Sequence, residues 1–479
     1  MELRREPAQD DGRKASHDSD TPKALVDFMS GNWLDVPPVT GHVPELERYR
    51  ERRAALSKEY RGTYVVIPAG GEKVRANDTS FRYRPSSDFA YLLGGGEPGA
   101  LLVLEPKGAG HESVLFVPAH NRGSAEFFSD RVYGELWVGR HRGVEESKEF
   151  FGVDRCRPIA DIRVYLDDLR GAGHAAAVVR SNDDVIDALL PNSSRDGELA
   201  TQLSEMRLIK DEFEISELRT CCEISKRGFE DVIAILPKAR SEREVEAAFW
   251  SRARIEANDV GYLTIAAAGD HACTLHWNHN HGKVSQGDLL LLDAGVEVDS
   301  LYTADITRTL PISGKFSAEQ RAVYELVYEA QRAGFAEVRP GNDFLDPNRA
   351  AMRVLAQGLI DMRILKCSLE EALSPENLYY KRYTLHNVSH MLGIDVHDCA
   401  KARSETYRYG KLAAGMVLTV EPGLYFQPDD ATVPEAFRGI GVRIEDDVVV
   451  THQGHENLSG ILPSAPDDVE TRMKEVWNR

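Results

Sequence analysis

The chain has 479 residues, of which 42% are hydrophobic and 28% are charged, and its formal net charge is −19. The length predicts two or three domains that each bury a core, and the acidic balance argues against nucleic acid or an anionic membrane as a partner, because both bind basic surfaces. No run approaches the roughly 18 apolar residues of a membrane-spanning helix.

Residues 1–40 are polar and irregular, and we interpret them as an N-terminal arm with one short helix at 23–29. The stretch is charged from its second residue and lacks the apolar core of a secretory signal. The six cysteines contain no CxxC pair and do not form a disulfide framework in a chain this long. Together these features predict a cytoplasmic protein.

Short apolar runs bounded by glycine and proline characterise residues 41–200, and they predict a mixed α/β N-terminal domain. The run at 175–180 is followed by a helical pattern. The predicted strands lie at 63–70, 88–93, 100–106, 113–120 and 175–180.

Long helices and apolar strands alternate over residues 201–479, which predicts a second domain of the α+β class. Three helix starts carry a capping box, in which two side chains satisfy free backbone donors. The boxes pair Asp211 with Glu214, Ser241 with Glu244, and Ser317 with Gln320. The predicted strands lie at 288–296, 301–310, 415–421 and 440–451.

Two aspartates follow the run LLLL at 289–292, which has the pattern of a fully buried strand. A hairpin turn centred on Asp299 would make Asp293 and Asp305 direct cross-strand partners, with Cβ atoms about 5 Å apart. Arg308 would point to the opposite face of the strand and would not neutralise Asp305. Since burying unpaired carboxylates costs several kcal/mol, the pattern predicts a bound cation.

Further candidate ligands come from three later segments. Glu421 ends the apolar strand GMVLTV, Glu445 lies inside the strand GVRIEDDVVV, and HNVSHMLGIDVHD supplies three histidines. Each residue taken singly could be a solvated acid or a core histidine. Taken together, two Asp, two Glu and one His without cysteine favour Mn²⁺, Co²⁺, Fe²⁺ or Zn²⁺. Five such side chains can hold two ions about 3.5–4 Å apart.

The segments DAGVE, TADITRTLPISGKFSAEQ, HNVSHMLGIDVHD, LTVEPGLY and GIGVRIEDD occur in this order, and the chain resembles the pita-bread metallopeptidases, within them aminopeptidase P, from about residue 63 to 458. The resemblance implies an aminopeptidase P N-terminal domain over 41–200 and a pita-bread (creatinase/aminopeptidase) catalytic domain over 201–479. It also implies five ligands for two divalent metal ions, with Mn²⁺ expected: Asp293, Asp305, His390, Glu421 and Glu445. Asp305 and Glu445 would bridge the ions.

The implied reaction is hydrolysis of the N-terminal Xaa-Pro bond of a peptide by a hydroxide that bridges the two ions. Glu421 would carry the proton to the leaving nitrogen, and His397 would stabilise the developing oxyanion. His276, in LHWNHNHG, and His386 would hold the substrate. Two further residues, Tyr425 and Arg443, would support the site, with Arg443 orienting Glu445.

The resemblance extends into the first domain. Asp78 matches an aspartate that reaches the active site of a neighbouring subunit, and Trp137 matches an aromatic that walls the cleft; their structural alternatives are a turn cap and a core tryptophan. We therefore expect a homodimer or homotetramer. Two features depart from the family pattern: Asp293 and Asp305 are 12 residues apart, one more than usual, and His386 is followed by asparagine where the family commonly has glycine.

The sequence alone is also compatible with other functions of the same fold. A prolidase would act on Xaa-Pro dipeptides, and a peptide-binding module would have lost the metal. A methionine aminopeptidase does not need a first domain of this size, and a metal-free hydrolase of the creatine-cleaving type would not need the five ligand residues, all of which are present.

Overall fold

The computed structural model describes residues 22–479, and the chain divides into two compact units, Met1–Leu203 and Ser204–Arg479. The predicted arm over 1–40 lies partly outside the described residues. Its described part includes helix α1 (Lys23–Ser30), where a short helix was predicted, and an extended stretch that follows it.

A five-stranded sheet forms the centre of unit 1, with the order β6-β5-β4-β1-β7. The pairs β1–β4 and β4–β5 are antiparallel, and β1–β7 and β5–β6 are parallel. Isoleucine and leucine side chains of two helices, α7 (Ile162–Gly171) and α8 (Asp184–Leu189), pack on valines of this sheet. The strands are β1 (Tyr64–Pro68), β4 (Leu101–Lys107), β5 (Gly110–Val117), β6 (Arg155–Pro158) and β7 (Ala176–Val178).

The strand predicted at 88–93 is wrong, because these residues form helix α3 (Ser87–Leu93). Phe89 and the four residues after it are all buried, so a short apolar run fits a buried helix as well as a strand. Gly94 ends the helix in the left-handed conformation, with φ of 81°, and donates its N–H to the carbonyl of Ala90. Gly94 is therefore the C-cap of this helix.

The remaining elements of unit 1 are one longer helix, several short helices and a β-hairpin. They are α2 (Leu46–Glu59), α4 (Glu126–Ser129), α5 (Glu135–Val138), α6 (Val144–Phe151), and the hairpin β2 (Val74–Ala76) with β3 (Thr79–Ser80). Helix α9 (Ser194–Met206) spans the division between the units.

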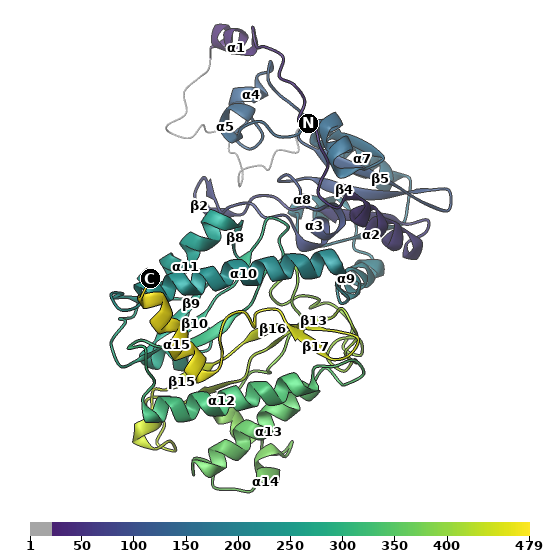
Figure 1. Ribbon diagram of the computed structural model, residues 1–479. Helices are drawn as coiled ribbons and strands as arrows, with labels where there is room; N and C mark the ends of the chain where they lie inside the picture. Colours follow the sequence, from purple (N-terminus) through teal and green to yellow (C-terminus); the bar gives the residue numbers. More distant parts are fainter. Residues whose placement is uncertain (1–21) are drawn as a thin grey trace. The chain divides into compact units, whose positions relative to one another are not determined.

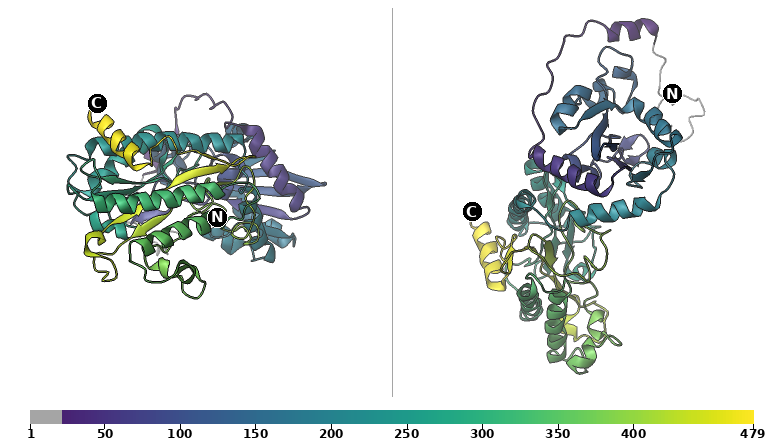
Figure 2. Two further views of the ribbon diagram at one scale, coloured as in Figure 1. Left: turned by 60° about the horizontal axis from the view of Figure 1, so that its bottom comes forward. Right: turned by 90° about the vertical axis from the view of Figure 1, so that its right-hand side faces the viewer.

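Two pairs of long helices enclose the strands of unit 2. Figures 1 and 2 show α10 (Glu212–Ile235) and α11 (Glu242–Glu256) on one side of these strands, and α12 (Ala318–Glu337) and α13 (Asp346–Asp361) on the other. The C-terminal helix α15 (Pro466–Trp477) contacts α10 and α12. Because both faces of the strands are covered, a side chain at a strand end lies in a largely water-free interior.

The strands of unit 2 are short and nearly all buried. They form two three-stranded sheets, β12-β10-β9 and β13-β16-β17, and two two-stranded pairs, β11-β8 and β14-β15. The strands are β8 (Asp259–Val260), β9 (Ile265–Ala268), β10 (Leu289–Asp293), β11 (Val296–Glu297), β12 (Thr307–Pro311), β13 (Val417–Val420), β14 (Gly423–Tyr425), β15 (Gly441–Arg443), β16 (Asp446–Val450) and β17 (His455–Asn457).

Two of the three predicted capping boxes form in full. They lie at the starts of α10 and α12. At α11 the hydroxyl of Ser241 accepts the N–H of Glu244, but the Glu244 carboxylate accepts the N–H of Arg240 instead of closing the box. Within the described part of the chain, no helix has both the length and the apolarity needed to cross a bilayer.

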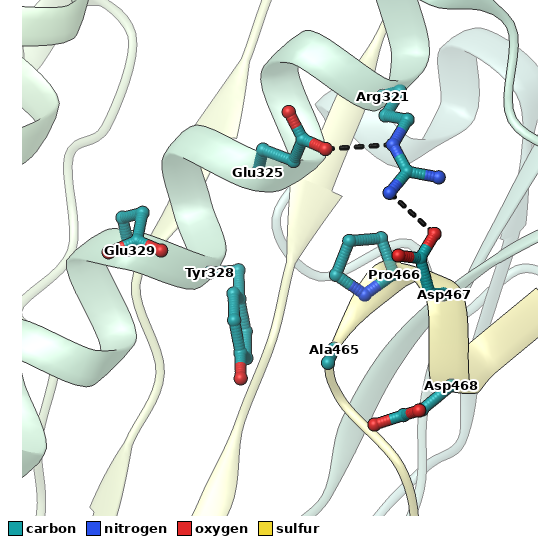
Figure 3. Close-up of a pocket in the computed structure, with 8 residues that line it drawn as sticks. All are labelled: Arg321, Glu325, Tyr328, Glu329, Ala465, Pro466, Asp467 and Asp468. Carbon is teal, nitrogen blue, oxygen red and sulfur yellow. Dashed lines mark hydrogen bonds and ion pairs between the residues drawn. The ribbon is translucent and has the colours of Figure 1, made fainter.

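A shallow hollow lies on the surface of unit 2 between α12 and the start of α15. Figure 3 shows Arg321 in this hollow, bonded to Glu325 at 2.7 Å and to Asp467 at 2.6 Å. None of the residues predicted for the active site lines it. The candidate site lies instead among the buried strands.

Candidate metal centre

The hairpin that carries the two aspartates has a register different from the predicted one. Asp293 pairs with Thr307 in the antiparallel ladder of β10 and β12, so Asp305 is a diagonal neighbour and not the direct partner. The turn is centred on Ser300, where the N–H of Val298 donates to the carbonyl of Tyr302. The predicted turn centre at Asp299 is thus wrong by one residue. Asp305 is two residues from Thr307, the direct partner of Asp293, so the carboxylates of Asp293 and Asp305 stay on one face.

Three of the five predicted ligands converge closely. Asp305, His390 and Glu445 each offer a ligand atom, and these atoms all lie within 4.8 Å of one another. Glu445 lies between β15 and β16, not inside a strand as predicted, and its N–H donates to the carbonyl of Thr307 at 3.0 Å. This contact places Glu445 beside the hairpin that carries the aspartates.

Backbone bonds to strand β13 fix the histidine ligand. The N–H of His390 donates to the Thr419 hydroxyl at 3.2 Å, and the N–H of Thr419 donates to the His390 carbonyl at 3.0 Å. The N–H of Glu421, directly after β13, donates to the Val388 carbonyl at 2.8 Å. As a result Nε2 of His390 lies 3.3 Å from Asp305 Oδ2 and 3.7 Å from Glu421 Oε1.

Arg443 connects the aspartate side of the site to its tyrosine. Its guanidinium donates to Asp293 Oδ2 at 2.5 Å, to the Tyr425 hydroxyl at 3.0 Å and to the Thr307 hydroxyl at 3.2 Å. The Thr307 hydroxyl in turn donates to Glu445 at 2.7 Å. The sequence predicted that Arg443 orients Glu445. Its ionic partner is Asp293, and the hydrogen bonds that connect it to Glu445 run through Thr307.

Three of the four carboxylates of the site, those of Asp293, Glu421 and Glu445, are hard to ionise. Burial, followed by repulsion from neighbouring acids, raises the pKa of Glu445 well above its usual value. Burial also raises the pKa of Glu421 to about 8, and it raises the pKa of Asp293 although Arg443 opposes this shift. The donor set of four carboxylates and the imidazole of His390 fits divalent cations.

The contact between His390 and Asp305 shifts the pKa of each group toward its charged form. Burial alone would lower the pKa of His390, but its hydrogen bond with Asp305 and the charge of Glu421 raise this pKa to about 9. Burial alone would raise the pKa of Asp305, but the contact with His390 lowers it overall. The contact therefore favours the charged forms of both Asp305 and His390.

Three other predicted histidines lie beside these ligands. His386 accepts or donates at 2.7 Å to the Tyr425 hydroxyl, and its Nδ1 lies 3.5 Å from Glu421. Burial and the charge of Arg443 lower the pKa of His386 to about 4. The ring of His397 lies 4.5 Å from that of His390, and burial, followed by the charge of His390, lowers the pKa of His397. His276 is exposed.

Asp78 and Trp137 belong to unit 1, and their predicted roles stay predictions. Asp78 is exposed in the turn between β2 and β3. The indole of Trp137 is also exposed, and its N–H donates to the carbonyl of Phe128 at 2.7 Å. Trp137 is therefore not a core residue, which removes the structural alternative considered for it.

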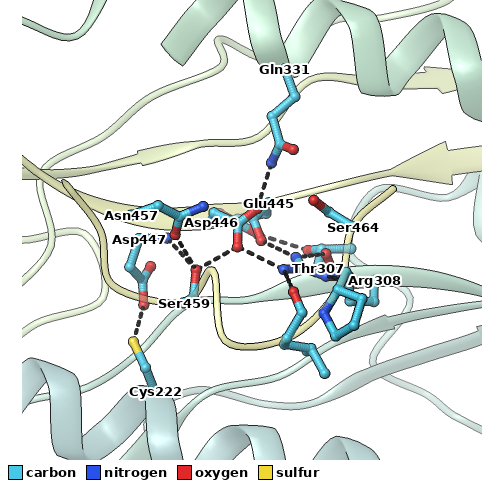
Figure 4. Close-up of polar contacts among 12 residues, drawn as sticks. Cys222, Thr307, Arg308, Gln331, Glu445, Asp446, Asp447, Asn457, Ser459 and Ser464 are labelled. Atoms are coloured by element: carbon cyan, nitrogen blue, oxygen red, sulfur yellow. Dashed lines mark hydrogen bonds and ion pairs between the residues drawn. The ribbon is translucent and has the colours of Figure 1, made fainter. Parts of the chain in front are cut away.

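Sequence reasoning missed Asp447, which holds the backbone of a ligand. Its carboxylate accepts the N–H of Asp305 at 3.1 Å. It also accepts the thiol of Cys222 at 3.3 Å (Figure 4). Burial and the charge of Asp305 raise the pKa of Asp447 well above its usual value. The signal in the sequence was the run EDDVVV, where only alternation along the strand separates a ligand from its support.

Arg308 pairs with Asp446 instead of Asp305, as its position in the strand predicted. It is fully buried and donates to Asp446 at 2.7 Å and to the Glu445 carbonyl at 2.6 Å (Figure 4). We expect Arg308→Met to lower the free energy of unfolding by about 3–5 kcal/mol, because it leaves Asp446 buried without its cation.

Urea unfolding of the metal-loaded protein measures this loss. Arg321→Met is the matched control, since Arg321 pairs with acids at the surface, where an ion pair contributes little. Equal losses in the two variants would contradict the role given to Arg308.

Glu242 on α11 is a second residue that the sequence did not reveal. Its buried carboxylate accepts hydrogen bonds from the N–H groups of Ala268 and Gly282, from the indole of Trp277 and from the ring of His271, at 2.6–2.9 Å. These contacts hold the loop that carries His276.

We expect Glu242→Ala to lower kcat/KM for peptide hydrolysis about tenfold to 100-fold without changing the metal content, because the loop and not the ligand set is released. Steady-state kinetics and metal analysis on the same sample test this. Glu246→Ala on the same helix should be near parental. Loss of metal in Glu242→Ala would contradict the assignment.

Comparisons with known proteins agree with this geometry. Residues 216–452 match the model of metallopeptidase family M24, and residues 49–178 match that of the aminopeptidase P N-terminal domain. Xaa-Pro aminopeptidase 1 of Streptomyces coelicolor is 51% identical over 461 residues, which cover 94% of this chain and 91% of the relative.

The chain belongs to metallopeptidase family M24. Two solved structures share its fold. Aminopeptidase P of Escherichia coli with the inhibitor Pro-Leu has a TM-score of 0.81 and 32% identity, covering 92% of this chain and 100% of the other. Aminopeptidase PepP of Pseudomonas aeruginosa has a TM-score of 0.80 and 34% identity, covering 91% and 100%. The predicted family, the pita-bread fold with its N-terminal domain, and the metalloaminopeptidase class are thus confirmed.

Proposed function

We propose that this family M24 protein is an Xaa-Pro aminopeptidase, which hydrolyses the first peptide bond of substrates with proline at the second position. The observation that carries the proposal is the buried convergence of Asp305, His390 and Glu445, with Asp293 and Glu421 beside them. Relatives that carry this name match the chain over nearly its full length.

The five predicted ligands would hold two divalent ions, for which we propose Mn²⁺. When bound, such ions supply Lewis-acid polarisation of a carbonyl and lower the pKa of water to near neutrality. We assign Asp305 and Glu445 to both positions, and their ligand atoms lie within 4.8 Å of each other and of that of His390. Asp293, held by Arg443 and Tyr262, would complete one position and Glu421 the other.

The protein side chains provide proton transfer and substrate positioning. A Glu421 carboxyl whose pKa lies near 8 without metal is easily protonated, and we assign it the transfer of a proton to the leaving nitrogen. His386 is neutral at physiological pH, and its bond to Tyr425 leaves its ring fixed for a contact with the substrate. His397 and His276 are exposed beside the site and are assigned to the substrate carbonyl and backbone.

Proline at the second position removes the N–H of the scissile bond. A site for this substrate must accept the ring and must not depend on that donor. Asp78 and Trp137 are our candidates for the remaining substrate contacts, within a homodimer or homotetramer in the cytoplasm. The six free cysteines are consistent with a reducing compartment.

Three peptides assayed in parallel with Mn²⁺ test the proposal: an Xaa-Pro-Yaa tripeptide, the Xaa-Pro dipeptide and an Xaa-Ala-Yaa tripeptide. We expect release of the first residue from Xaa-Pro-Yaa with kcat/KM at least tenfold above that for either other peptide. Hydrolysis confined to the dipeptide would make the protein a prolidase, and preference for alanine would overturn the proline assignment.

A further inference from the structure

A second cluster of metal-ligating side chains lies in unit 1, far in sequence from the ligands described above. His120 follows β5, Glu135 begins helix α5, and His141 lies in the loop after it. Each offers one ligand atom, and the three atoms all lie within 4.8 Å of one another. Nothing in the proposed hydrolysis uses them. We propose that these three side chains form a zinc site that ties together the segment 119–143.

His141 has a ring nitrogen with a free lone pair, as a metal ligand requires. Nδ1 of His141 lies 3.3 Å from the carbonyl of Arg142, which it can bond only as a donor, so Nε2 carries the lone pair. Nε2 is buried, and within residues 22–479 no group forms a hydrogen bond with it. A buried acceptor without a partner costs free energy that a metal ion would recover.

The other histidine is already bonded to the carboxylate. Nδ1 of His120 lies 2.6 Å from Glu135 Oε1, a hydrogen-bond distance in the metal-free state. Ligands about 2.0–2.1 Å from a tetrahedral zinc lie about 3.4 Å apart, so zinc would displace the shared proton and separate the two atoms slightly. The set of two histidines and one carboxylate leaves a fourth position for water.

Surrounding groups hold the ligands as supporting residues of metal sites do. Nε2 of His120 lies 3.5 Å from Glu146, a carboxylate that would fix the ring's tautomer once Nδ1 binds the metal. The N–H of Glu135 donates to the Asn121 amide oxygen at 3.1 Å. A side chain at Gly143 would come within 2.6 Å of His120 Nε2, so glycine allows the ring its position. The rings of His120 and His141 stack with centroids 5.7 Å apart.

The segment itself has little apolar core. Among residues 119–143 the buried positions are Phe127, Gly134, Glu135 and Gly143, and helices α4 and α5 have four residues each. Leu136, Trp137 and Val138 are exposed. A metal that links the start, the middle and the end of such a segment would supply the stability that packing does not.

Zinc counting on the full-length chain tests the site. The chain is stripped with a chelator, equilibrated with buffered Zn²⁺ at low micromolar free concentration, and analysed by plasma mass spectrometry. We expect His141→Ala and His120→Ala to hold one zinc fewer per chain than the parent. The control His174→Ala, an exposed histidine of the same unit, should hold the parental number. Equal counts in His141→Ala and the parent would overturn the proposal.

Two further measurements keep the test decisive if a histidine variant does not fold. They also distinguish this site from the catalytic one. A chain with Asp305→Asn and Glu445→Gln should still bind one zinc, and binding of none would overturn the proposal whatever the proposed hydrolysis does. Trypsin cleavage after Arg131 should slow at least fivefold with zinc in the parent but not in His141→Ala. Equal slowing in both chains would also overturn it.

Discussion

Asp305→Asn is expected to lower kcat for Xaa-Pro-Yaa hydrolysis by at least about 10³-fold, which corresponds to about 4 kcal/mol of transition-state stabilisation. The carboxylate lies 3.3 Å from His390, and its ligand atom lies within 4.8 Å of that of Glu445. Asparagine keeps the size of the side chain but removes the charge, so it cannot bridge two cations equally well. Activity and metal content, measured with and without added Mn²⁺, give the result.

Asp299→Asn is the matched control for this change. Asp299 is exposed in the turn of the same hairpin, so the substitution removes the same charge a few residues away. We expect parental kcat and metal content for it. A loss of activity in Asp305→Asn that is smaller than tenfold, with metal content unchanged, would contradict the bridging role.

The metal-free protein is expected to lose stability as the pH rises from 6.5 to 9. Glu421 has its pKa raised from 4.5 to about 8 and His390 from 6.5 to about 9. In this window the folded chain binds more protons than the unfolded chain, so the free energy of unfolding falls with pH. His386, with its pKa lowered to about 4, changes stability only below about pH 6.5. We expect a fall on the order of 1–3 kcal/mol.

Differential scanning fluorimetry at several pH values, with chelator or with Mn²⁺, measures this dependence. With Mn²⁺ the fall should vanish, since the ions favour the deprotonated ligands and their binding contributes about 2.7 kcal/mol at 100 times Kd. Glu421→Gln should flatten the metal-free curve. A metal-free protein whose melting temperature rises between pH 6.5 and 9 would refute this account of the site's charge balance.

The ligand residues could be predicted because chemistry and position coincide in the sequence. A run of four leucines directly before Asp293 indicates a buried strand, and a buried acid needs a cation. The alternation along the second strand placed Arg308 on the face opposite to Asp305, and Arg308 is found bonded to Asp446. Because side chains alternate along a strand, the sequence predicts which residues share a face even where the pairing with the next strand is unknown.

The sequence could not predict the register of the hairpin or the contacts between segments that are distant in the sequence. The hairpin turn is centred on Ser300 because Leu301 adopts a left-handed conformation, with φ of 69°, which a leucine rarely does. The direct partner of Arg443 and the support from Glu242 and Asp447 depend on which strands and loops become neighbours. Helix α3 was mistaken for a strand because a run of five apolar residues, 89–93, is too short to separate the two periods.

The central claim is that the buried acids of unit 2 are kept ionised by divalent ions that the reaction needs. Calorimetric titration of Mn²⁺ into the chelator-treated protein at pH 7.5, in two buffers of different ionisation enthalpy, tests this most directly. We expect two equivalents of metal per chain and the release of at least one proton, because Glu421 and His390 hold protons only while metal is absent. Full hydrolytic activity in the chelated protein, or metal binding without proton release, would contradict the account.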